Sequence, residues 1–390
     1  MASKGTVVIL PGIGGSQLSY KGGSGGKTAL WWNPVALLAN TPLAMGLNTD
    51  GKSPWPLVGK TLFPDGPVAF GIYEPLITAI ANAGYTPVFW AYDWRLKQTD
   101  LATAFVAFLQ GQSLSNPFYV VCHSMGGIVA QLAYPTWKAL GSVPTWATTI
   151  YLGTPHGGSY WSGACLSGLW TTGNELYSLG FLLDWTTQSP GVIDIAKKAA
   201  LAIAGQLVGS WPSVYGLLPS SAGQWAALDA LAVNVLQLSY YATTPGGQQN
   251  QWLQFAQTLM TTLVNNYTQP RPAELSIYGL DQQTPNALNA LSHPELLASY
   301  KTASDGDGTV IEQRAVLPVG SQRGFKRTAH NSLPNTLGPI NLLLAALSAV
   351  PTGDEVLLNL PGVVNTPPQP IPLETLPNIP APFVNLHGDP

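Results

Sequence analysis

The chain has 390 residues, a net charge of −3 and 9% charged residues, against roughly 25% in an average soluble domain. That length is ample for a large core and would allow more than one domain. The weak net charge and the lack of a basic cluster argue against nucleic acid and anionic membrane surfaces as partners. No apolar run reaches the roughly 20 residues of a membrane-spanning helix, so we expect no transmembrane segment.

The start of the chain and its cysteines bear on the compartment. A strand-like run begins at about residue 6, which predicts that this sequence carries no signal peptide. The alternatives are a cytoplasmic protein or an exported one whose leader has been removed. Cys122 and Cys165 are the only cysteines, and we expect both to be free thiols.

Short apolar runs alternate with helical patterns along the chain. The strand-like runs lie at about 7–11, 86–92, 117–123, 147–152, 274–279 and 325–330. Helical patterns such as 73–83 and 102–109 separate them, and a C-terminal helix is expected at 336–350. This alternation predicts an α/β fold, with a mostly parallel sheet covered by helices on both faces.

Two intervals are too long for simple crossover helices. They span about 20–70 and 160–270 and are rich in Trp, Leu, Gly and Pro. Long excursions above strand ends are where lids and substrate walls are placed, so we expect two cap insertions within one catalytic domain, 1–335. The tail, 351–390, has a proline spacing that excludes regular helix and predicts an extended segment.

Tryptophans of the two insertions are candidates for an apolar-lined cleft. Trp31 and Trp32 in the first insertion and Trp161 in the second are the candidate substrate-binding residues. The second insertion also contains Trp170, Trp185 and Trp211. For any single tryptophan, the alternative is a place in the small core of the insertion itself.

A strand-to-helix junction surrounds Ser124. The apolar run Phe118 to His123 breaks at this serine into Met-Gly-Gly, and a helical pattern follows. In a nucleophile elbow, such a turn raises the serine Oγ above the sheet and points the first helix amides at the same place. The turn needs small residues two positions before and after the serine: Gly126 fits, and Cys122 replaces the first glycine of GxSxG. The alternative is a buried strand that ends in an ordinary turn.

A serine nucleophile needs a histidine base and an acid, which follow it in the order Ser, Asp or Glu, His. His123 adjoins the serine and is expected to point elsewhere. His156 precedes any candidate acid and is interpreted as a loop-shaping residue. His293 also comes before the best acid, and His387 lies in the proline-rich tail. His330, which opens a loop, remains as the candidate base.

Two aspartates compete for the acid. The strand-like run that starts at Leu275 leads through a turn-rich stretch to Ser304-Asp-Gly-Asp-Gly-Thr-Val. We take Asp307, which directly precedes Gly308, and keep Asp305 as the reserve. The alternative is a plain turn. A calcium-binding EF-hand loop is excluded because further carboxylates and the terminal Glu are missing.

The oxyanion-binding amides are expected to be those of Ile13, in the Gly-rich loop after the first strand, and Met125, directly after the serine. This loop matches neither phosphate-binding pattern, GxGxxG or GxxxxGK[ST]. We expect no cofactor, and no metal, because no His, Cys or carboxylate cluster has zinc-like spacing.

The motifs together resemble the lecithin:cholesterol acyltransferase-like branch of the α/β-hydrolases. The resemblance spans most of residues 5–335 and is carried by the following segments: Leu10-Pro-Gly-Ile-Gly-Gly-Ser-Gln-Leu, Trp31-Trp32, Ala91-Tyr-Asp-Trp-Arg-Leu, His123-Ser-Met-Gly-Gly, Gly153-Thr-Pro-His-Gly-Gly-Ser, Pro212-Ser-Val-Tyr-Gly-Leu-Leu-Pro, Asp305-Gly-Asp-Gly-Thr-Val and His330-Asn. It implies a triad of Ser124, Asp307 and His330, with Ile13 and Met125 at the oxyanion. The chain lacks the cysteine pair that staples the first lid of animal members. We interpret Arg95 as structural, holding loops together, rather than as a substrate contact.

The leading functional hypothesis is a serine esterase or lipase that cleaves an apolar, lipid-like carboxylic ester through an acyl-enzyme. An acyltransferase shares every step up to the acyl-enzyme and is the first alternative. A non-catalytic lipid-binding protein is the second alternative, and amide or lactone chemistry the third. The sequence determines neither the ester nor the oligomeric state.

Overall fold

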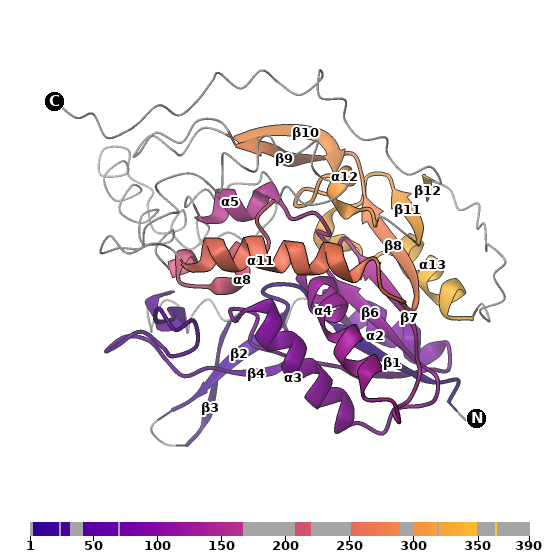
Figure 1. The fold of residues 1–390 in the computed structure, drawn as a ribbon, viewed down its shortest axis with the longest axis horizontal. Helices are drawn as coiled ribbons and strands as arrows, with labels where there is room; N and C mark the ends of the chain where they lie inside the picture. The colour runs from indigo at the N-terminus through magenta and orange to yellow at the C-terminus, as the bar shows by residue number, and fades with distance from the viewer. Residues whose placement is uncertain are drawn as a thin grey trace.

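A computed structural model describes residues 3–22, 25–31, 42–68, 71–166, 207–219, 251–288, 300–317, 320–348 and 363–364. The strands of its main sheet are β1 (Thr6–Leu10), β5 (Thr86–Phe89), β6 (Phe118–His123), β7 (Trp146–Leu152), β8 (Ala273–Gly279), β11 (Ser321–Phe325) and β12 (Val363–Val364). They lie in the order β12-β11-β8-β7-β6-β1-β5 (Figure 1). The six strands from β11 to β5 are parallel, and β12 is antiparallel to β11.

Helices cover both faces of this sheet. The helices are α2 (Glu74–Asn82), α3 (Gln98–Gln110), α4 (Met125–Ala139), α11 (Gln251–Asn266) and α13 (Leu337–Ser348). Side chains of β1 alternate between the faces: Val8 and Leu10 pack with α3, α4 and α11, whereas Val7 and Ile9 pack with α2 and α13. A strand buried on both faces has to be apolar throughout, which explains its sequence. These layers confirm the predicted α/β architecture, and the strand order and elbow define an α/β-hydrolase fold.

One predicted strand was wrong in its position. The expected strand at 325–330 is in fact β11 at 321–325, and the residues after it turn at Arg327, whose φ is +56°. The strand had no apolar signature because it lies beside the short edge strand β12, and its first residue, Ser321, is exposed. The chain then enters a short 3-10 helix, η4 (His330–Ser332).

Two strands of the first long interval pair with a strand that begins just before it, in a small separate sheet. Its strands are β2 (Ser16–Lys21), β3 (Lys27–Trp31) and β4 (Phe63–Pro67), and a 3-10 helix, η1 (Pro42–Met45), follows β3 in the chain. The sheet is antiparallel in the order β3-β2-β4. It extends directly from the loop after β1, so it can brace that loop.

Only parts of the second interval are described. They are α5 (Tyr160–Leu166), α8 (Pro212–Tyr215) and α11, the last of which lies against α4 (Figure 1). Further along, a hairpin of β9 (Gln282–Leu288) and β10 (Tyr300–Gly306) and the short helix α12 (Glu312–Ala315) precede β11. The tail from 351 onwards lies outside the described residues apart from β12. None of the helices in the described ranges is long and apolar enough to cross a membrane.

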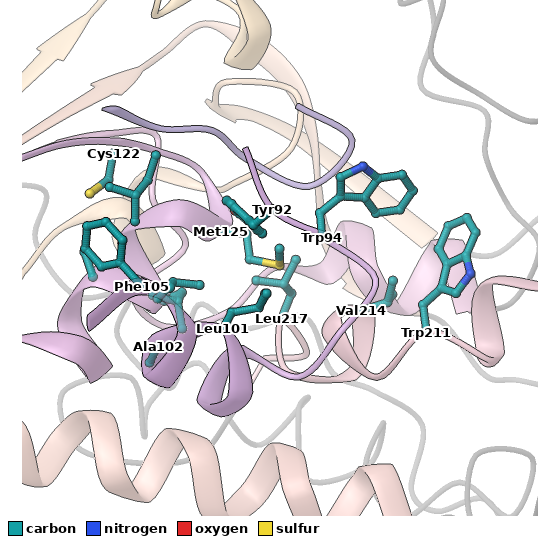
Figure 2. Close-up of a cluster of buried hydrophobic side chains, with 14 of the residues drawn as sticks. Tyr92, Trp94, Leu101, Ala102, Phe105, Cys122, Met125, Trp211, Val214 and Leu217 are labelled. Atoms are coloured by element: carbon teal, nitrogen blue, oxygen red, sulfur yellow. The ribbon is translucent and has the colours of Figure 1, made fainter. Parts of the chain in front are cut away.

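An arginine and a tryptophan join the two intervals. Arg95 pairs with Asp93 at 2.6 Å and donates to the carbonyl of Met45 at 2.8 Å. The Trp211 indole donates to the same carbonyl at 3.0 Å and meets the Trp94 ring edge-on, with centroids 5.1 Å apart. Figure 2 shows the pair at one end of a layer of buried side chains that includes Met125. These contacts confirm the structural interpretation of Arg95 and put Trp211 in the core.

Candidate active site

The order of the strands determines where a site can form. Strands that follow β1 in sequence lie on both sides of it, with β5 on one side and β6 on the other. The order of strands therefore reverses at β1. In open parallel sheets, the loops at such a point leave in opposite directions, and a crevice opens between them at the carboxyl ends of the strands. The loops that leave this point are the Gly-rich loop after β1 and the Ser124 turn after β6. They touch, because a methyl group added at Gly12 would lie 2.7 Å from Ser124 Cβ.

Ser124 has a strained backbone, with φ +52° and ψ −127°. A non-glycine residue with positive φ persists only where its surroundings impose it. The space around the turn explains its small residues: a methyl group at Gly126 would meet the carbonyl oxygens of Pro11 at 2.6 Å and Leu10 at 2.8 Å. Cys122 is fully buried under the same turn. The strand, the strained turn at Ser124 and the helix after it have the geometry that the elbow prediction requires, and the role of Ser124 as nucleophile stays a prediction.

Asp307 and His330 form a buried hydrogen-bonded pair. The His330 ring nitrogen Nδ1 lies 2.7 Å from Asp307 Oδ2. The other carboxylate oxygen accepts the backbone amides of Thr309 at 3.0 Å and Val310 at 2.8 Å, and the His330 amide donates to the Asp307 carbonyl at 2.8 Å. Because a carboxylate only accepts hydrogen bonds, Nδ1 of His330 is the donor to Asp307, and the two backbone amides fix the direction in which the carboxylate faces the imidazole. Asp305, the reserve candidate, is not brought to His330; burial raises the pKa of its carboxyl.

The second ring nitrogen of His330 is chemically available. An imidazole that donates from Nδ1 to a carboxylate keeps a lone pair on Nε2. This Nε2 is buried and makes no hydrogen bond to any described residue, Ser124 included. Ser124 lies close by, since its amide donates to Leu152, and a methyl group at the next residue, Gly153, would lie 3.0 Å from both Asp307 Oδ2 and His330 Nδ1. In enzymes without bound substrate, hydrogen bonds between a nucleophile and its base are often long or poorly aligned.

Hydrogen bonds from other elements hold the loop after β1. The Tyr92 hydroxyl donates to the Pro11 carbonyl at 2.6 Å, and the Trp31 indole donates to the Gly14 carbonyl at 2.7 Å. The Gly12 amide donates to the Tyr73 hydroxyl at 2.9 Å.

The two predicted oxyanion amides remain available beside Ser124. Within the described ranges, the Ile13 amide has no acceptor. Met125 is the first residue of α4, where helical amides have no intrahelical acceptor. If Ser124 attacks a carbonyl carbon, two such amides beside it can stabilise the negative charge that develops on the carbonyl oxygen.

The predicted tryptophans have different surroundings. Trp31 is buried under the Gly-rich loop, where its indole supports the Gly14 carbonyl. Trp161 is partly buried and lies at the start of α5. Trp32, Trp170 and Trp185 lie outside the described residues. The predicted contacts of Trp31 and Trp161 with substrate stay a prediction.

The other histidines and the cysteines also have defined places. His123 and His156 are buried, and burial is the main cause that lowers both pKa values well below the usual range. His293 and His387 fall outside the described residues. Cys122 and Cys165 are buried free thiols. Across the described part of the chain, no group of three His, Cys, Asp or Glu residues could hold a metal ion.

Sequence reasoning missed two residues beside the site, Tyr73 and Tyr92. Both are buried, and both hydroxyls bond to the backbone of the loop after β1. Tyr73 lies in none of the motifs. Tyr92 lies in the Ala91-Tyr-Asp-Trp-Arg-Leu segment, but the local sequence does not show that its hydroxyl reaches the Pro11 carbonyl.

Solved structures resemble the chain at low sequence identity. No protein-family model matches the sequence, and no curated protein matches it. Among solved structures, the mature Bacillus licheniformis lipase BlEst2 is 13% identical, with a TM-score of 0.41, and the match covers 89% of this chain and 93% of that one. The Tle4–Tli4 complex is 12% identical, with a TM-score of 0.48, and the match covers 88% of this chain and 97% of that one. An extracellular α/β-hydrolase from a Paenibacillus species is 10% identical, with a TM-score of 0.31, and the match covers 87% of this chain and 97% of that one. The fold assignment itself rests on the strand order and the elbow of this chain.

Proposed function

We propose that the protein is a serine hydrolase that cleaves apolar carboxylic esters, with Ser124 as nucleophile, His330 as base and Asp307 as the orienting acid. The observation that carries the proposal is the buried His330–Asp307 pair beside the strained Ser124. A histidine with one nitrogen on a carboxylate and the other unpartnered within the described chain has the arrangement that a general base needs.

The reaction follows from these groups. The Ser124 oxygen attacks the ester carbonyl carbon while its proton passes to Nε2 of His330, and Asp307 stabilises the imidazolium that forms. The carbonyl oxygen becomes an oxyanion, which accepts hydrogen bonds from the Ile13 and Met125 amides. When the intermediate collapses, the bond to the alkoxy oxygen breaks and the alcohol leaves with the proton from Nε2. Water then attacks the acyl-enzyme by the same steps and regenerates Ser124.

An apolar substrate is supported by the composition of the chain and by aromatic contacts between its two long intervals. Only 9% of residues are charged, and aromatic side chains line the join between the two long intervals. We propose that the intervals at 20–70 and 160–270 act as caps over the acyl chain. Because α11 lies against α4, we place the cap part of the second interval before Gln251. Trp161, which is less buried than Trp31, is the stronger candidate for a substrate contact.

The motif resemblance supports membership of the lecithin:cholesterol acyltransferase-like branch. Transfer to an alcohol would use the same acyl-enzyme and would differ only in whether a bound alcohol or water reaches the acyl group. A non-catalytic lipid-binding role would leave the strain at Ser124 and the buried His330–Asp307 pair without a use.

Fluorophosphonate labelling tests the nucleophile. A fluorophosphonate should label the wild-type protein stoichiometrically at Ser124, and Ser124→Ala should lose both labelling and turnover while its thermal unfolding stays unchanged. Labelling at another serine would overturn the assignment.

A panel of p-nitrophenyl esters tests the substrate class. Activity should rise from acetate to medium-chain esters, since each buried methylene contributes about 0.8 kcal/mol. Repeating the panel with an added alcohol separates the reactions, because transfer yields a new ester and hydrolysis yields the free acid. A flat chain-length profile would contradict the apolar cleft.

A further inference from the structure

A chain of buried hydrogen bonds connects the oxyanion loop to the backbone of the proposed base. The Gly12 amide lies 2.9 Å from the Tyr73 hydroxyl, and this hydroxyl lies 2.8 Å from Nδ1 of His123. The other ring nitrogen of His123 lies 3.1 Å from the His330 carbonyl oxygen. All three bonds are buried and span 61, 50 and 207 residues of sequence, so no local element holds these groups together.

We propose that Tyr73 and His123 are positioning residues that hold the oxyanion loop and the His330 loop in register on either side of Ser124. The inference rests on the proposed function, because it assumes that His330 is the base and that the Ile13 amide binds the oxyanion. Neither Tyr73 nor His123 takes part in the chemical steps. Their role is to fix where the reacting groups lie.

The chemistry of the partners sets the direction of every bond in the chain. A carbonyl oxygen can only accept, so Nε2 of His123 carries the proton and donates to His330. In the neutral imidazole, Nδ1 is then an acceptor, and the Tyr73 hydroxyl donates to it. The tyrosine oxygen in turn accepts the Gly12 amide. Burial, which lowers the pKa of His123, favours this neutral form.

Close packing restricts the side chains that form this series of hydrogen bonds. Tyr73 is 1% exposed and His123 is 4% exposed. The His123 ring lies against the His330 ring, with centroids 4.9 Å apart, and meets the Tyr73 ring edge-on at 5.7 Å. A methyl group at Gly12 would lie 3.2 Å from His123 Nδ1, so the loop is also in contact with the imidazole. His123 is therefore wedged between the two loops.

The bonds act at the two positions that matter for the proposed chemistry. By holding the Gly12 amide, Tyr73 sets the orientation of the residue that precedes Ile13, and with it the direction of the Ile13 amide. His330 is held on both sides of its backbone: its amide donates to Asp307, and its carbonyl accepts from His123. Both constraints aim groups at the place where charge develops, where small displacements are costly.

Tyr73→Phe is the test, and Tyr85→Phe is its matched control. Tyr85 is also buried, and its hydroxyl donates to the Leu347 carbonyl at 2.7 Å, in the layer formed by α2 and α13. Each variant removes one buried tyrosine hydroxyl and one hydrogen bond to the backbone, and Tyr73→Phe also removes the bond to His123. A purely structural role therefore predicts a loss of stability but unchanged kinetics in both variants.

We expect Tyr73→Phe to lower kcat about 10- to 100-fold, less than the loss of an oxyanion donor itself, which costs about 10²- to 10³-fold. KM should change little, and the Ki of an alkyl trifluoromethyl ketone, which forms a tetrahedral adduct, should rise by the same factor as kcat/KM falls. Tyr85→Phe should retain wild-type kcat and Ki. Active enzyme is counted by fluorophosphonate titration, so misfolded protein does not enter kcat.

A second variant tests whether the two residues act as one unit. His123→Gln should lower kcat in the same range, and the double variant should be no slower than the worse single variant, because both act through the same chain of bonds. Unchanged kcat and Ki in Tyr73→Phe, or strictly multiplicative losses in the double variant, would overturn the inference. Failure of wild-type labelling at Ser124 would instead overturn the proposed function, so the two failures are distinguishable.

Discussion

Two buried histidines, His330 and His156, occupy opposite chemical situations in the same molecule. Nδ1 of His156 lies 2.6 Å from Nε2 of Gln131, and its other ring nitrogen lies 3.5 Å from the Ser276 hydroxyl. In His330, Nδ1 is bound to Asp307, and Nε2 has no partner among the residues described. Burial is similar at both, so it does not separate them.

The comparison shows that a candidate base is recognised by a ring nitrogen that makes no hydrogen bond within the protein. The Gln131 amide donates to His156, so the opposite nitrogen carries the proton toward Ser276, whose hydroxyl donates to the Ala315 carbonyl at 2.8 Å. The Tyr267 hydroxyl donates to the Gln131 side chain at 3.0 Å and completes the network. Such a histidine stabilises loops and has no lone pair to offer a substrate. This agrees with its interpretation as a loop-shaping residue.

The largest expected effect separates these two histidines directly. His330→Gln should lower kcat about 10⁴- to 10⁶-fold, as the loss of a triad member does, and leave the melting temperature nearly unchanged. His156→Gln should leave kcat largely unchanged and lower the free energy of unfolding by about 1–3 kcal/mol, since buried partners lose their hydrogen bonds. Steady-state kinetics and thermal unfolding of both variants measure this. The reverse assignment of losses would show that the unused nitrogen is not the criterion.

The two aspartates sharpen the comparison on the acid side. Asp307→Asn should lower kcat about 10⁴-fold, because the amide no longer stabilises the imidazolium or the required tautomer. Asp305→Asn, two residues earlier near the end of β10, is the control and should retain most activity. The kcat of each variant with one p-nitrophenyl ester measures the difference. Equal losses would contradict a specific role for Asp307.

A smaller effect is expected from the glycine beneath the elbow. In Gly126→Ala, the added methyl group would meet two backbone carbonyls, and such overpacking costs about 1–3 kcal/mol of stability. Gly111→Ala is the control, since the nearest atom there is 3.4 Å from the added methyl group and its φ is −82°. Chemical denaturation gives both values. A neutral Gly126→Ala would mean that the strand and helix at Ser124 can separate without cost.

The smallest expected effect concerns Glu312, a carboxyl group near Asp305 whose protonation affects the stability of the fold. Burial, then the charges of Asp305 and Asp281, raise the pKa of Glu312 from 4.5 to about 7. Between these values unfolded Glu312 has lost its proton and folded Glu312 keeps it, so stability falls as pH rises from 4.5 to 7.

Glu312→Gln removes this titration. The variant should melt a few degrees above wild type at pH 8 and no higher than wild type at pH 4. Melting curves across this range test the assignment. A stabilisation that is the same at every pH would point to packing rather than to charge.

Tertiary structure alone decided the partners of several residues. The strand expected at 325–330 is β11 at 321–325, which lies beside the short edge strand β12, where its first residue is exposed and an apolar sequence is not required. Trp211 pairs with Trp94 across the molecule, and His123 bridges Tyr73 and His330. Each of these contacts depends on how long stretches of chain close on one another, and a single sequence carries no local record of that.

The sequence by itself determined the features that depend on local backbone geometry, which are the α/β alternation and the turn at Ser124. Apolar period and small residues at the Ser124 turn predicted an α/β sheet with an elbow, because only certain side chains fit a buried strand or the close approach at Gly126. It could rank Asp307 above Asp305 by its neighbour Gly308. Only the tertiary structure brings one carboxylate against His330, since that contact joins separate loops through backbone hydrogen bonds whose partners the local pattern does not specify.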